Sequence, residues 1–393
     1  MRACFISAFA AASIVFTLDG QTHIRATAAT AVATSIAPSV AVVALPDGAI
    51  QPQTVVDTND VIHVVYFSGA PAAGNLYYVR LAGDGHRLTE PVRVNNIDGS
   101  ALATGSVRGA QVSLGRSGFV HVAWHGAKPI PGGGADTVPM WYSRSTDGAH
   151  FEPQRTVSGS SKNLDGGSVA ADAAGHVAVV WHAMGAVPGE GHRTVYIAKS
   201  SDDGASFSAE APATPAPIGA CGCCGMRALF DRSGTLHVLY RAATNDTNRD
   251  TTWLMIRGAS PRAPVRVHPW QLQTCPMSTY ALTESGDGLV AAWETAQQIY
   301  SASLDSKSAT VGPIGAVPGS GVRKHPSVAV NRTGERLLAW TEGTAWNRGG
   351  TAAWRLTDSS GKQLASSQDV GPVPVWGLVS VVALRDGSFV LLR

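Results

Sequence analysis

One pattern recurs about every fifty residues, and this repeat constrains the fold more than any other feature of the sequence. Each unit has an alternating apolar segment, a Gly-containing turn and a second alternating segment that ends in an aromatic residue. Alternation around a tight turn is typical of an antiparallel hairpin with one buried face. The terminal aromatics are Tyr66, Trp124, Trp181, Tyr240, Trp293 and Trp340, spaced 58, 57, 59, 53 and 47 residues apart.

A second, weaker pair of β segments follows each hairpin, as in MWYSRSTDGAHFEPQRTV at 140–157. Four short strands per period predict the blade of a β-propeller. We therefore expect an all-β protein built from four-stranded antiparallel blades. The alternative is a string of β-sandwich modules, which need longer periods with linkers between them.

The number of blades follows from the two ends of the repeat. A seventh inner hairpin occupies 376–392, but only six outer pairs are present, so the last blade is incomplete. The segment Pro38–Leu45 (PSVAVVAL) is predicted to complete it and remove an open sheet edge. Seven blades are predicted, with six as the alternative, and either count gives a single domain over 29–393.

Residues 1–28 have the pattern of a secretory signal peptide. A positive start is followed by an apolar run at 3–18 and by small residues, with cleavage expected after Ala28 or Ala33. Cys4 leaves with this peptide. The alternative is a buried helix or a membrane anchor, for which the run is short. We expect a periplasmic or secreted bacterial protein with no membrane span after cleavage, in a compartment where disulfides form.

The charge composition excludes several classes of function. Charged residues make up 15% of the chain and the formal net charge is +2, whereas an average globular domain has roughly 25% charged residues. The 44% of hydrophobic residues argues against disorder. A nucleic-acid partner is not expected, because such proteins concentrate positive charge.

Two turns have the S-x-D-x-G-x-x-F form of an Asp-box, one of them a residue shorter. In such a turn the carboxylate accepts backbone N–H bonds, Gly adopts a left-handed conformation and the aromatic packs below. The box residues are Ser145, Asp147, Gly148 and Phe151, and Ser200, Asp202, Gly204 and Phe207. With these boxes the chain resembles the sialidase-like (BNR/Asp-box) propellers over its whole mature length.

A narrower resemblance lies at 221–276. Here C-x-C-C, Tyr-Arg, Arg-Asp, Val-His, Trp and Cys-Pro follow in the order found in a subgroup of secreted bacterial sialidase-like proteins. The string comprises Cys221, Cys223 and Cys224, then Tyr240-Arg241, Arg249-Asp250, Val267-His268, Trp270 and Cys275-Pro276. Members of this subgroup are often labelled exo-α-sialidase by homology. The six elements in this order within 56 residues point to a site here and do not name a reaction.

If the chain were a sialidase-type glycoside hydrolase, the resemblance implies an arginine clamp for a carboxylate, a Tyr–Glu nucleophile pair and an aspartic acid. An arginine fork suits a carboxylate because it binds bidentately. The residues available for these roles are Arg227, Arg241 and Arg323, Tyr280 with Glu294, and Asp250. The early Arg-Ile-Pro motif of that family is absent, so we rank binding above hydrolysis.

Propeller topology brings the starts of inner strands and the ends of second strands to one rim. Propellers bind ligands at such a channel mouth, so a cluster of Cys, His and Arg residues there predicts a site for a small molecule, a glycan or a metal. The expected ligand-binding residues are Arg108, His125, His182, Arg227, Arg241, Asp250, His268, Trp270 and His325.

The four mature cysteines, Cys221, Cys223, Cys224 and Cys275, allow two interpretations. They could form structural disulfides between adjacent blades. They could instead bind a soft metal, Cu(I) or Zn(II), together with a methionine or a rim histidine. We predict an accessory role in binding a ligand or metal. The alternatives are an exo-α-sialidase and an interaction module that docks another envelope protein.

Overall fold

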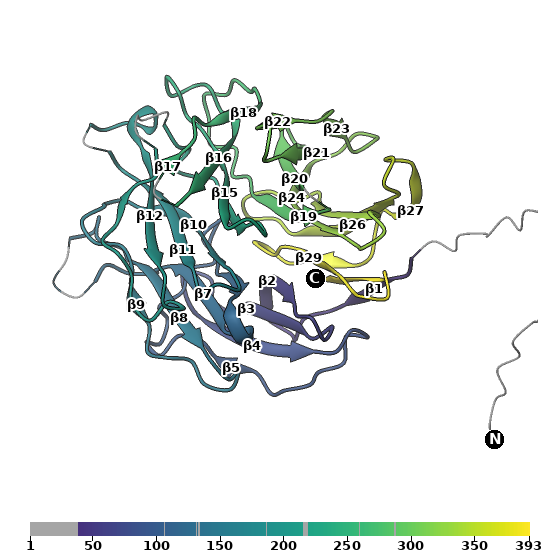
Figure 1. Ribbon diagram of the computed structural model, residues 1–393, viewed down its shortest axis with the longest axis horizontal. Coiled ribbons are helices and arrows are strands. Elements are labelled where there is room, and N and C mark those ends of the chain that lie inside the picture. Colours follow the sequence, from purple (N-terminus) through teal and green to yellow (C-terminus); the bar gives the residue numbers. More distant parts are fainter. Residues whose placement is uncertain are drawn as a thin grey trace, which may run out of the picture. The chain divides into compact units, whose positions relative to one another are not determined.

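Seven β-sheets surround a common centre, so the predicted all-β, seven-bladed propeller is confirmed (Figure 1). The computed structural model describes residues 38–393, apart from 106, 131, 133, 186, 215–218, 259 and 287. The predicted signal peptide and its cleavage positions lie outside the described residues. None of the described helical segments is long and apolar enough to cross a membrane.

Each blade runs outward from the centre in sequence order. The innermost strands are β2 (Ala49–Val56), β6 (Gln111–Leu114), β10 (Asp165–Ala171), β14 (Arg227–Phe230), β19 (Tyr280–Ser285), β24 (Arg323–Val330) and β29 (Ser380–Ala383). The second strands are β3 (Ile62–Ala70), β7 (Val120–His125), β11 (Val177–Ala183), β15 (Thr235–Arg241), β20 (Gly288–Thr295), β25 (Arg336–Glu342) and β30 (Phe389–Leu392).

The third strands have six to nine residues, whereas most fourth strands have only two. The third strands are β4 (Ala73–Leu81), β8 (Met140–Ser145), β12 (Thr194–Ser200), β16 (Thr251–Arg257), β21 (Gln298–Asp305) and β26 (Gly350–Thr357). The fourth are β5 (Val92–Arg93), β9 (Arg155–Thr156), β13 (Ala211–Pro212), β17 (Ser260–Pro261), β22 (Thr310–Val311) and β27 (Gln363–Ser367). Further pairings add β18 (Val265–His268), β23 (Gly315–Ala316) and β28 (Pro372–Val373), and two 3-10 turns are η1 (Arg116–Gly118) and η2 (Glu190–His192).

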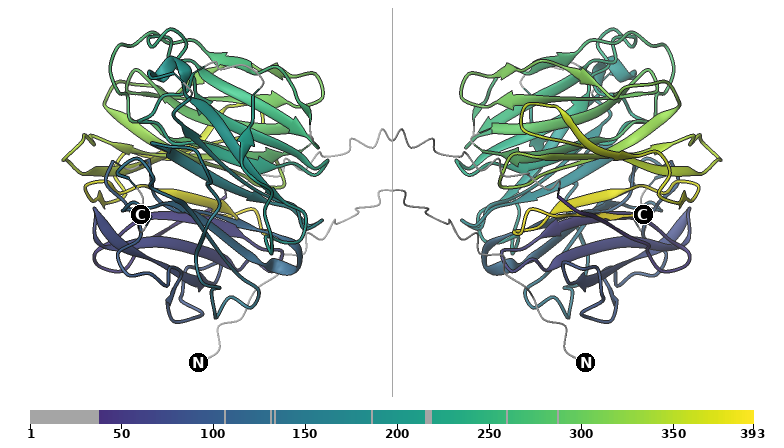
Figure 2. Two further views of the ribbon diagram at one scale, coloured as in Figure 1. Left: turned by 90° about the vertical axis from the view of Figure 1, so that its left-hand side faces the viewer. Right: turned by 90° about the vertical axis from the view of Figure 1, so that its right-hand side faces the viewer.

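The seventh blade joins the two ends of the propeller. Strand β1 (Val40–Val43) pairs in parallel with β30, which confirms that the predicted segment Pro38–Leu45 completes the last blade. That blade has three strands rather than four. Side chains of the first blade also bond to residues of the last, since Gln51 Nε2 donates to the Trp376 carbonyl (3.0 Å). Both side views in Figure 2 place the purple first blade next to the yellow last strands.

The hydrophobic core lies between neighbouring blades. The repeated aromatics at the ends of second strands are almost fully buried there, with Trp181, Trp293 and Trp340 each 0% exposed. Trp124 packs with Phe67 and Tyr78 of the preceding blade. Because sheets bury both faces against their neighbours, the alternating pattern becomes apolar on both sides near the centre.

Several inner strands begin with a β-bulge. The register shifts between Ile50 and Gln53 in β2, between Asp165 and Ser168 in β10, and between Lys324 and Ser327 in β24. Gln51 and His325 have positive φ at these points (57° and 54°). Strained backbone of this kind re-aims side chains and is common at ligand sites.

Candidate functional site

The starts of inner strands and the ends of second strands meet at one rim, here called the mouth. The Cys221 N–H donates to the carbonyl of Arg241, the last residue of β15 (2.9 Å). His182, near the end of β11, lies 3.1 Å from the Cys224 carbonyl through Nε2. The loop before β14 is therefore attached to the ends of two second strands.

Cys221, Cys223 and Cys224 form a buried thiol cluster at the mouth. Their side chains come together because the loop turns on itself, with Cys224 N donating to the Cys221 carbonyl (3.2 Å). Cys221 Sγ lies 3.3 Å from Cys223 Sγ and 3.4 Å from Cys224 Sγ. All three sulfurs lie within 4.8 Å of one another and none of the residues is more than 8% exposed.

No disulfide joins the four described cysteines. The clustered sulfurs lie farther apart than the roughly 2.05 Å of an S–S bond. Cys275 is exposed and lies outside the cluster, so a disulfide between adjacent blades is not found among these cysteines. The disulfide interpretation has no support in the structure, whereas the cluster has the composition of a soft-metal site.

The three thiols differ in their tendency to ionise. Burial disfavours a charged Cys224, but S–H contacts from Cys221 and Cys223 and the Arg241 charge hold the pKa of Cys224 well below its usual value. S–H contacts to the other two thiols and burial raise the pKa of Cys223. The contact with Cys223 lowers the pKa of Cys221, but contact with Cys224 and burial outweigh it, so that pKa is raised. Of the three thiols, Cys224 is therefore the one most readily ionised.

Four arginines surround the cluster and favour negative charge on it. The positive charge of each arginine acts on at least one of the cysteines. The four arginines are Arg108, Arg193, Arg241 and Arg249. Glu190 pairs with Arg249 and accepts the Gly222 N–H (2.9 Å), which braces the cysteine loop. Asp165 pairs with Arg108.

Arg241 is 1% exposed, and its charge acts on Cys224. It donates to Ser278 Oγ (3.2 Å) and to the carbonyls of Arg249 (2.6 Å) and Glu294 (2.5 Å). Its guanidinium carbon lies 4.8 Å from the centre of the Trp270 ring, within cation–π range. Ser278 also contacts Cys224 (3.5 Å between Oγ and Sγ), which links the cation to the cluster.

The predicted rim histidines are engaged by the protein. Arg193 Nη2 donates to His182 Nδ1 (3.2 Å), so the proton of His182 is on Nε2, facing the Cys224 carbonyl. Burial lowers the pKa of His182 to about 4. His125 is 6% exposed and its ring nitrogens face two carbonyls, those of Gly126 (2.7 Å) and Leu164 (2.9 Å).

His325 belongs to a different part of the mouth. Its Nδ1 lies 3.3 Å from Thr279 Oγ1, and burial lowers its pKa to about 3. It lines a cavity of about 320 Å³ together with Cys275, Met277 and Trp376. Trp346, 48% exposed, meets Trp376 edge-on at 6.2 Å between ring centroids, so an aromatic wall borders this cavity.

The six residues considered for hydrolysis do not share one pocket. Arg323 is held by Glu342 (3.5 Å) and by backbone carbonyls, and Asp250 accepts the Trp270 N–H (2.9 Å). The Glu294 carboxylate accepts the Gln297 N–H (2.5 Å), and burial raises its pKa. In the described part of the chain no hydrogen bond joins Glu294 to Tyr280. Arg227 and Tyr280 line the central channel, whereas Arg241 does not line it but lies 5.6 Å from the centre of the Tyr280 ring through its guanidinium carbon.

His268 contributes to packing between strands. Trp293 Nε1 donates to His268 Nδ1 (2.9 Å), and the Tyr300 ring meets it edge-on at 4.6 Å. Burial lowers the pKa of His268.

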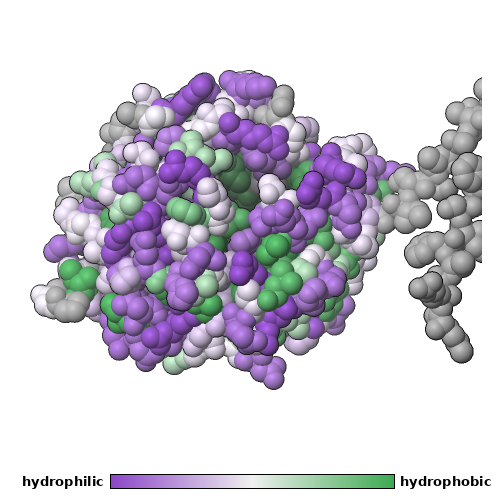
Figure 3. Space-filling view, turned by 60° about the horizontal axis from the view of Figure 1, so that its bottom comes forward, coloured by the Kyte–Doolittle hydropathy of each residue, from purple (hydrophilic) through white to green (hydrophobic). Residues whose placement is uncertain are grey.

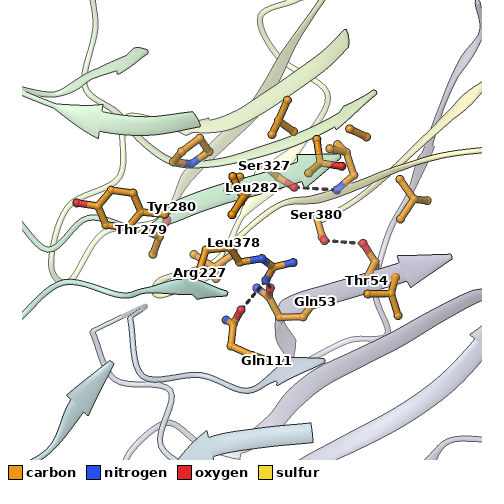
Figure 4. Close-up of a pocket in the computed structure, with 18 of the residues that line it drawn as sticks. Gln53, Thr54, Gln111, Arg227, Thr279, Tyr280, Leu282, Ser327, Leu378 and Ser380 are labelled. Carbon is orange, nitrogen blue, oxygen red and sulfur yellow. Dashed lines mark hydrogen bonds between the residues drawn. The ribbon is translucent and has the colours of Figure 1, made fainter. Parts of the chain in front are cut away.

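The central channel is a cavity of about 440 Å³ bordered by six of the seven inner strands. Figure 3 shows one face of the propeller, mainly hydrophilic and hollowed near its middle. Figure 4 shows Arg227 inside the cavity, where its Nη1 donates to Gln53 Oε1 (2.9 Å) and Gln111 Oε1 (2.5 Å).

Sequence reasoning missed several residues that shape these sites. They are Gln53, Gln111, Asp165, Glu190, Arg193, Ser278 and Trp346. Asp165 begins an inner strand as the cysteine loop does, so the rule that placed Arg108 at the rim also applies to it. Glu190 and Trp346 lie in loops between strands, where no periodic pattern marks them.

Both Asp-box turns have the hydrogen bonds that this motif requires. Asp147 Oδ1 accepts from the Ala149 and His150 N–H groups (2.8 Å each), and Gly148 has φ 68°. Phe207 of the second box packs edge-on against Tyr142 of the preceding blade (4.8 Å between ring centroids). These turns tie adjacent blades together.

No protein-family model and no curated protein matches the chain. Among solved structures, the chain is similar to a Hadza microbial sialidase at 14% identity, over 80% of this chain and 69% of that one, with a TM-score of 0.49. It is similar to Penicillium chrysogenum α-L-arabinanase complexed with arabinobiose at 12% identity, over 80% and 95% of the two chains, with a TM-score of 0.49. A functionally unknown protein from Desulfotomaculum acetoxidans is similar at 10% identity, over 88% and 89%, with a TM-score of 0.48. The strand pairing of the chain itself establishes the seven-bladed propeller.

Proposed function

We propose that this protein binds a soft metal ion, with Cu(I) as the preferred ion, through Cys221, Cys223 and Cys224 at the mouth of the propeller. The observation that carries the proposal is the meeting of three buried sulfurs within 4.8 Å. Sulfur ligands at about 2.3 Å from a metal lie roughly 3.8–4.0 Å apart around a three- or four-coordinate ion. The cluster needs to open by only about half an ångström to reach that spacing.

The surrounding charge supports this proposal. Three thiolates around Cu(I) carry two net negative charges, which are costly to bury without nearby cations. The guanidinium of Arg241 contacts Ser278, which in turn contacts Cys224, and the charges of Arg193 and Arg249 act on Cys221. These cations offset the charge of the metal–thiolate centre.

The donor set favours Cu(I) over Zn(II). Structural zinc is almost always held by four ligands, whereas Cu(I) is selected by thiolate and thioether sulfur. Met277 packs against the three cysteines and offers a further sulfur. Both His182 ring nitrogens are engaged by the protein, which leaves this histidine unsuited as a ligand.

An accessory role in metal handling outside the cytoplasm fits both the cluster and the predicted signal peptide. A buried ion with only sulfur ligands is suited to storage or transfer. This placement rests on the sequence pattern of residues 1–28.

Competitive titration of the fully reduced protein against a chromophoric Cu(I) chelator tests the proposal. We expect one Cu(I) per chain, and a loss of affinity of roughly 100-fold or more in Cys221→Ser or Cys224→Ser, since even outer-shell changes cost 10–100-fold. Cys275→Ser is the matched control, because this exposed thiol lies outside the cluster. Wild-type affinity in the Cys221→Ser/Cys223→Ser/Cys224→Ser variant, or no Cu(I) bound to the reduced wild type, would refute it.

A further inference from the structure

Arg227 is a cation inside the central channel. It follows Cys224, the last cysteine of the thiol cluster, by three positions in the sequence. It opens strand β14 and points into the cavity of about 440 Å³, as Figure 4 shows. Its Nη1 donates to the side-chain oxygens of Gln53 and Gln111, which come from β2 and β6. Three blades thus converge on one guanidinium.

This contact fixes the orientation of both glutamine amides. A guanidinium only donates hydrogen bonds, so each glutamine must turn its oxygen toward Arg227. The amide NH₂ groups of Gln53 and Gln111 then project away from Arg227, and no protein acceptor is recorded for either among the described residues. Ser327 adds another donor to the same cavity, because its oxygen accepts the Val381 N–H (3.0 Å) and its own proton stays available.

No carboxylate of the described residues pairs with Arg227 in the channel. Glu284 is the one carboxylate among the described residues lining the cavity, and it is occupied by Arg232, whose N–H it accepts (3.0 Å). Burial without a nearby carboxylate lowers the pKa of Arg227 to about 10. A desolvated cation without a partner destabilises a fold unless a ligand supplies the opposite charge.

We propose that the channel binds a small oxyanion, a carboxylate or a sulfate-like group, through Arg227 and the amide groups of Gln53 and Gln111. The guanidinium supplies the charge and a planar fork, and the two amides supply neutral donors on either side. The site differs from a three-arginine clamp, because Arg241 and Arg323 are held elsewhere by their own partners. It is also independent of metal binding by the cysteines.

Calorimetric titration and thermal unfolding with sodium sulfate and sodium acetate, at ionic strength matched with sodium chloride, test this site. Wild type is expected to gain roughly 2 °C or more in Tm at saturation. Preference for acetate indicates a planar ligand and preference for sulfate a tetrahedral one. In Arg227→Met the oxyanion-specific gain is expected to vanish, whereas in Arg227→Lys it is expected to persist in weakened form.

A second variant guards against misfolding of Arg227→Met. Gln53→Glu places a carboxylate beside Arg227, so it is expected to raise Tm without added anion and to abolish the anion response. Arg257→Met, at an exposed arginine away from the channel, is the matched control and retains the response. No oxyanion response in wild type, or an undiminished response in Arg227→Met or Gln53→Glu, would overturn the proposal.

Discussion

Two arginines inside the propeller, Arg241 at the mouth and Arg227 in the channel, show two ways of holding a guanidinium without a carboxylate. Arg241 uses its donors on two carbonyls and a serine hydroxyl and packs against the Trp270 ring. Arg227 has two glutamine oxygens on a single nitrogen and faces an open cavity. The first cation is committed to the protein, whereas the second keeps donors for a ligand.

The difference extends to what each cation does to its surroundings. Arg241 contributes to the low pKa of Cys224, so its charge is balanced within the fold. Arg227 has no acidic neighbour, so its charge stays available. Arg241 is therefore a positioning residue of the thiol cluster, and Arg227 a binding residue.

The largest expected effect is on stability. Arg241→Met should lower the free energy of unfolding by about 3–5 kcal/mol, because it leaves the buried carbonyls of Arg249 and Glu294 without their donors. Arg227→Met should cost less than about 1 kcal/mol, since it removes a cation whose burial is unfavourable. Urea denaturation measures both, and equal losses would break the comparison between the two arginines.

Metal binding at the mouth should depend steeply on pH. Cys221 and Cys223 have raised pKa values and must lose their protons to bind, whereas the pKa of Cys224 is held well below its usual value. The apparent Cu(I) affinity should therefore rise ~100-fold per pH unit near neutrality, as two protons are released. Competition titrations at several pH values measure the slope, and a steeper slope in Arg241→Met, which removes the positive charge, would sharpen the role of this cation. A slope near zero would contradict the ionisation pattern.

His182 should make the mouth sensitive to acid. Its folded pKa is about 4, below the ordinary value of 6.5, so the unfolded chain binds a proton that the folded one does not. The contribution of His182 to the free energy of unfolding is fully present above about pH 6.5. It falls as the pH drops toward 4, and about 2 kcal/mol of it is lost at pH 5. His182→Gln keeps a donor and an acceptor in place and should flatten the fall in Tm between pH 7 and 5. An unchanged profile would show that other groups dominate.

The smallest expected effect concerns the channel. Gln111→Met removes one acceptor from Arg227 and should cost no more than about 0.5 kcal/mol, because water in the cavity replaces part of the bond. Thermal unfolding measures it. Gln298→Met provides the comparison. It removes one acceptor from Arg323, whose Nη1 also donates to two backbone carbonyls. A loss above about 3 kcal/mol in Gln111→Met would mean that Arg227 is held as rigidly as Arg241.

The fold was predictable because its information is local and repeated. Alternation in each hairpin and an aromatic every 47 to 59 residues define the blades, and the leftover segment Pro38–Leu45 pairs where an open edge needed a strand. The proximity of Cys221, Cys223 and Cys224 was predictable, since three cysteines within four residues must lie close together. The separation of this cluster from Cys275 depends on how two loops of neighbouring blades are placed, which no spacing reveals.

The hydrogen-bond and ion-pair partners of the buried arginines could not be predicted, because they also come from strands that are brought together only in the folded propeller. Arg323 and Glu342 face each other across β24 and β25, a pair that emerges only once the bulge at Lys324 sets the register. Gln53 and Gln111 meet Arg227 across the channel, more than a hundred residues away in sequence. Such contacts follow from the radius of the closed propeller rather than from any motif.

The parallel ladder between β1 and β30 also sets an order of assembly. A chain made from its N-terminus must hold β1 unpaired until the final hairpin has been synthesised, so the six central blades form around an open gap. The bond from Gln51 to Trp376 can close only at that last step. The channel around Arg227 is thus a property of the finished molecule, and fragments lacking the final hairpin should leave Arg227 more open to solvent.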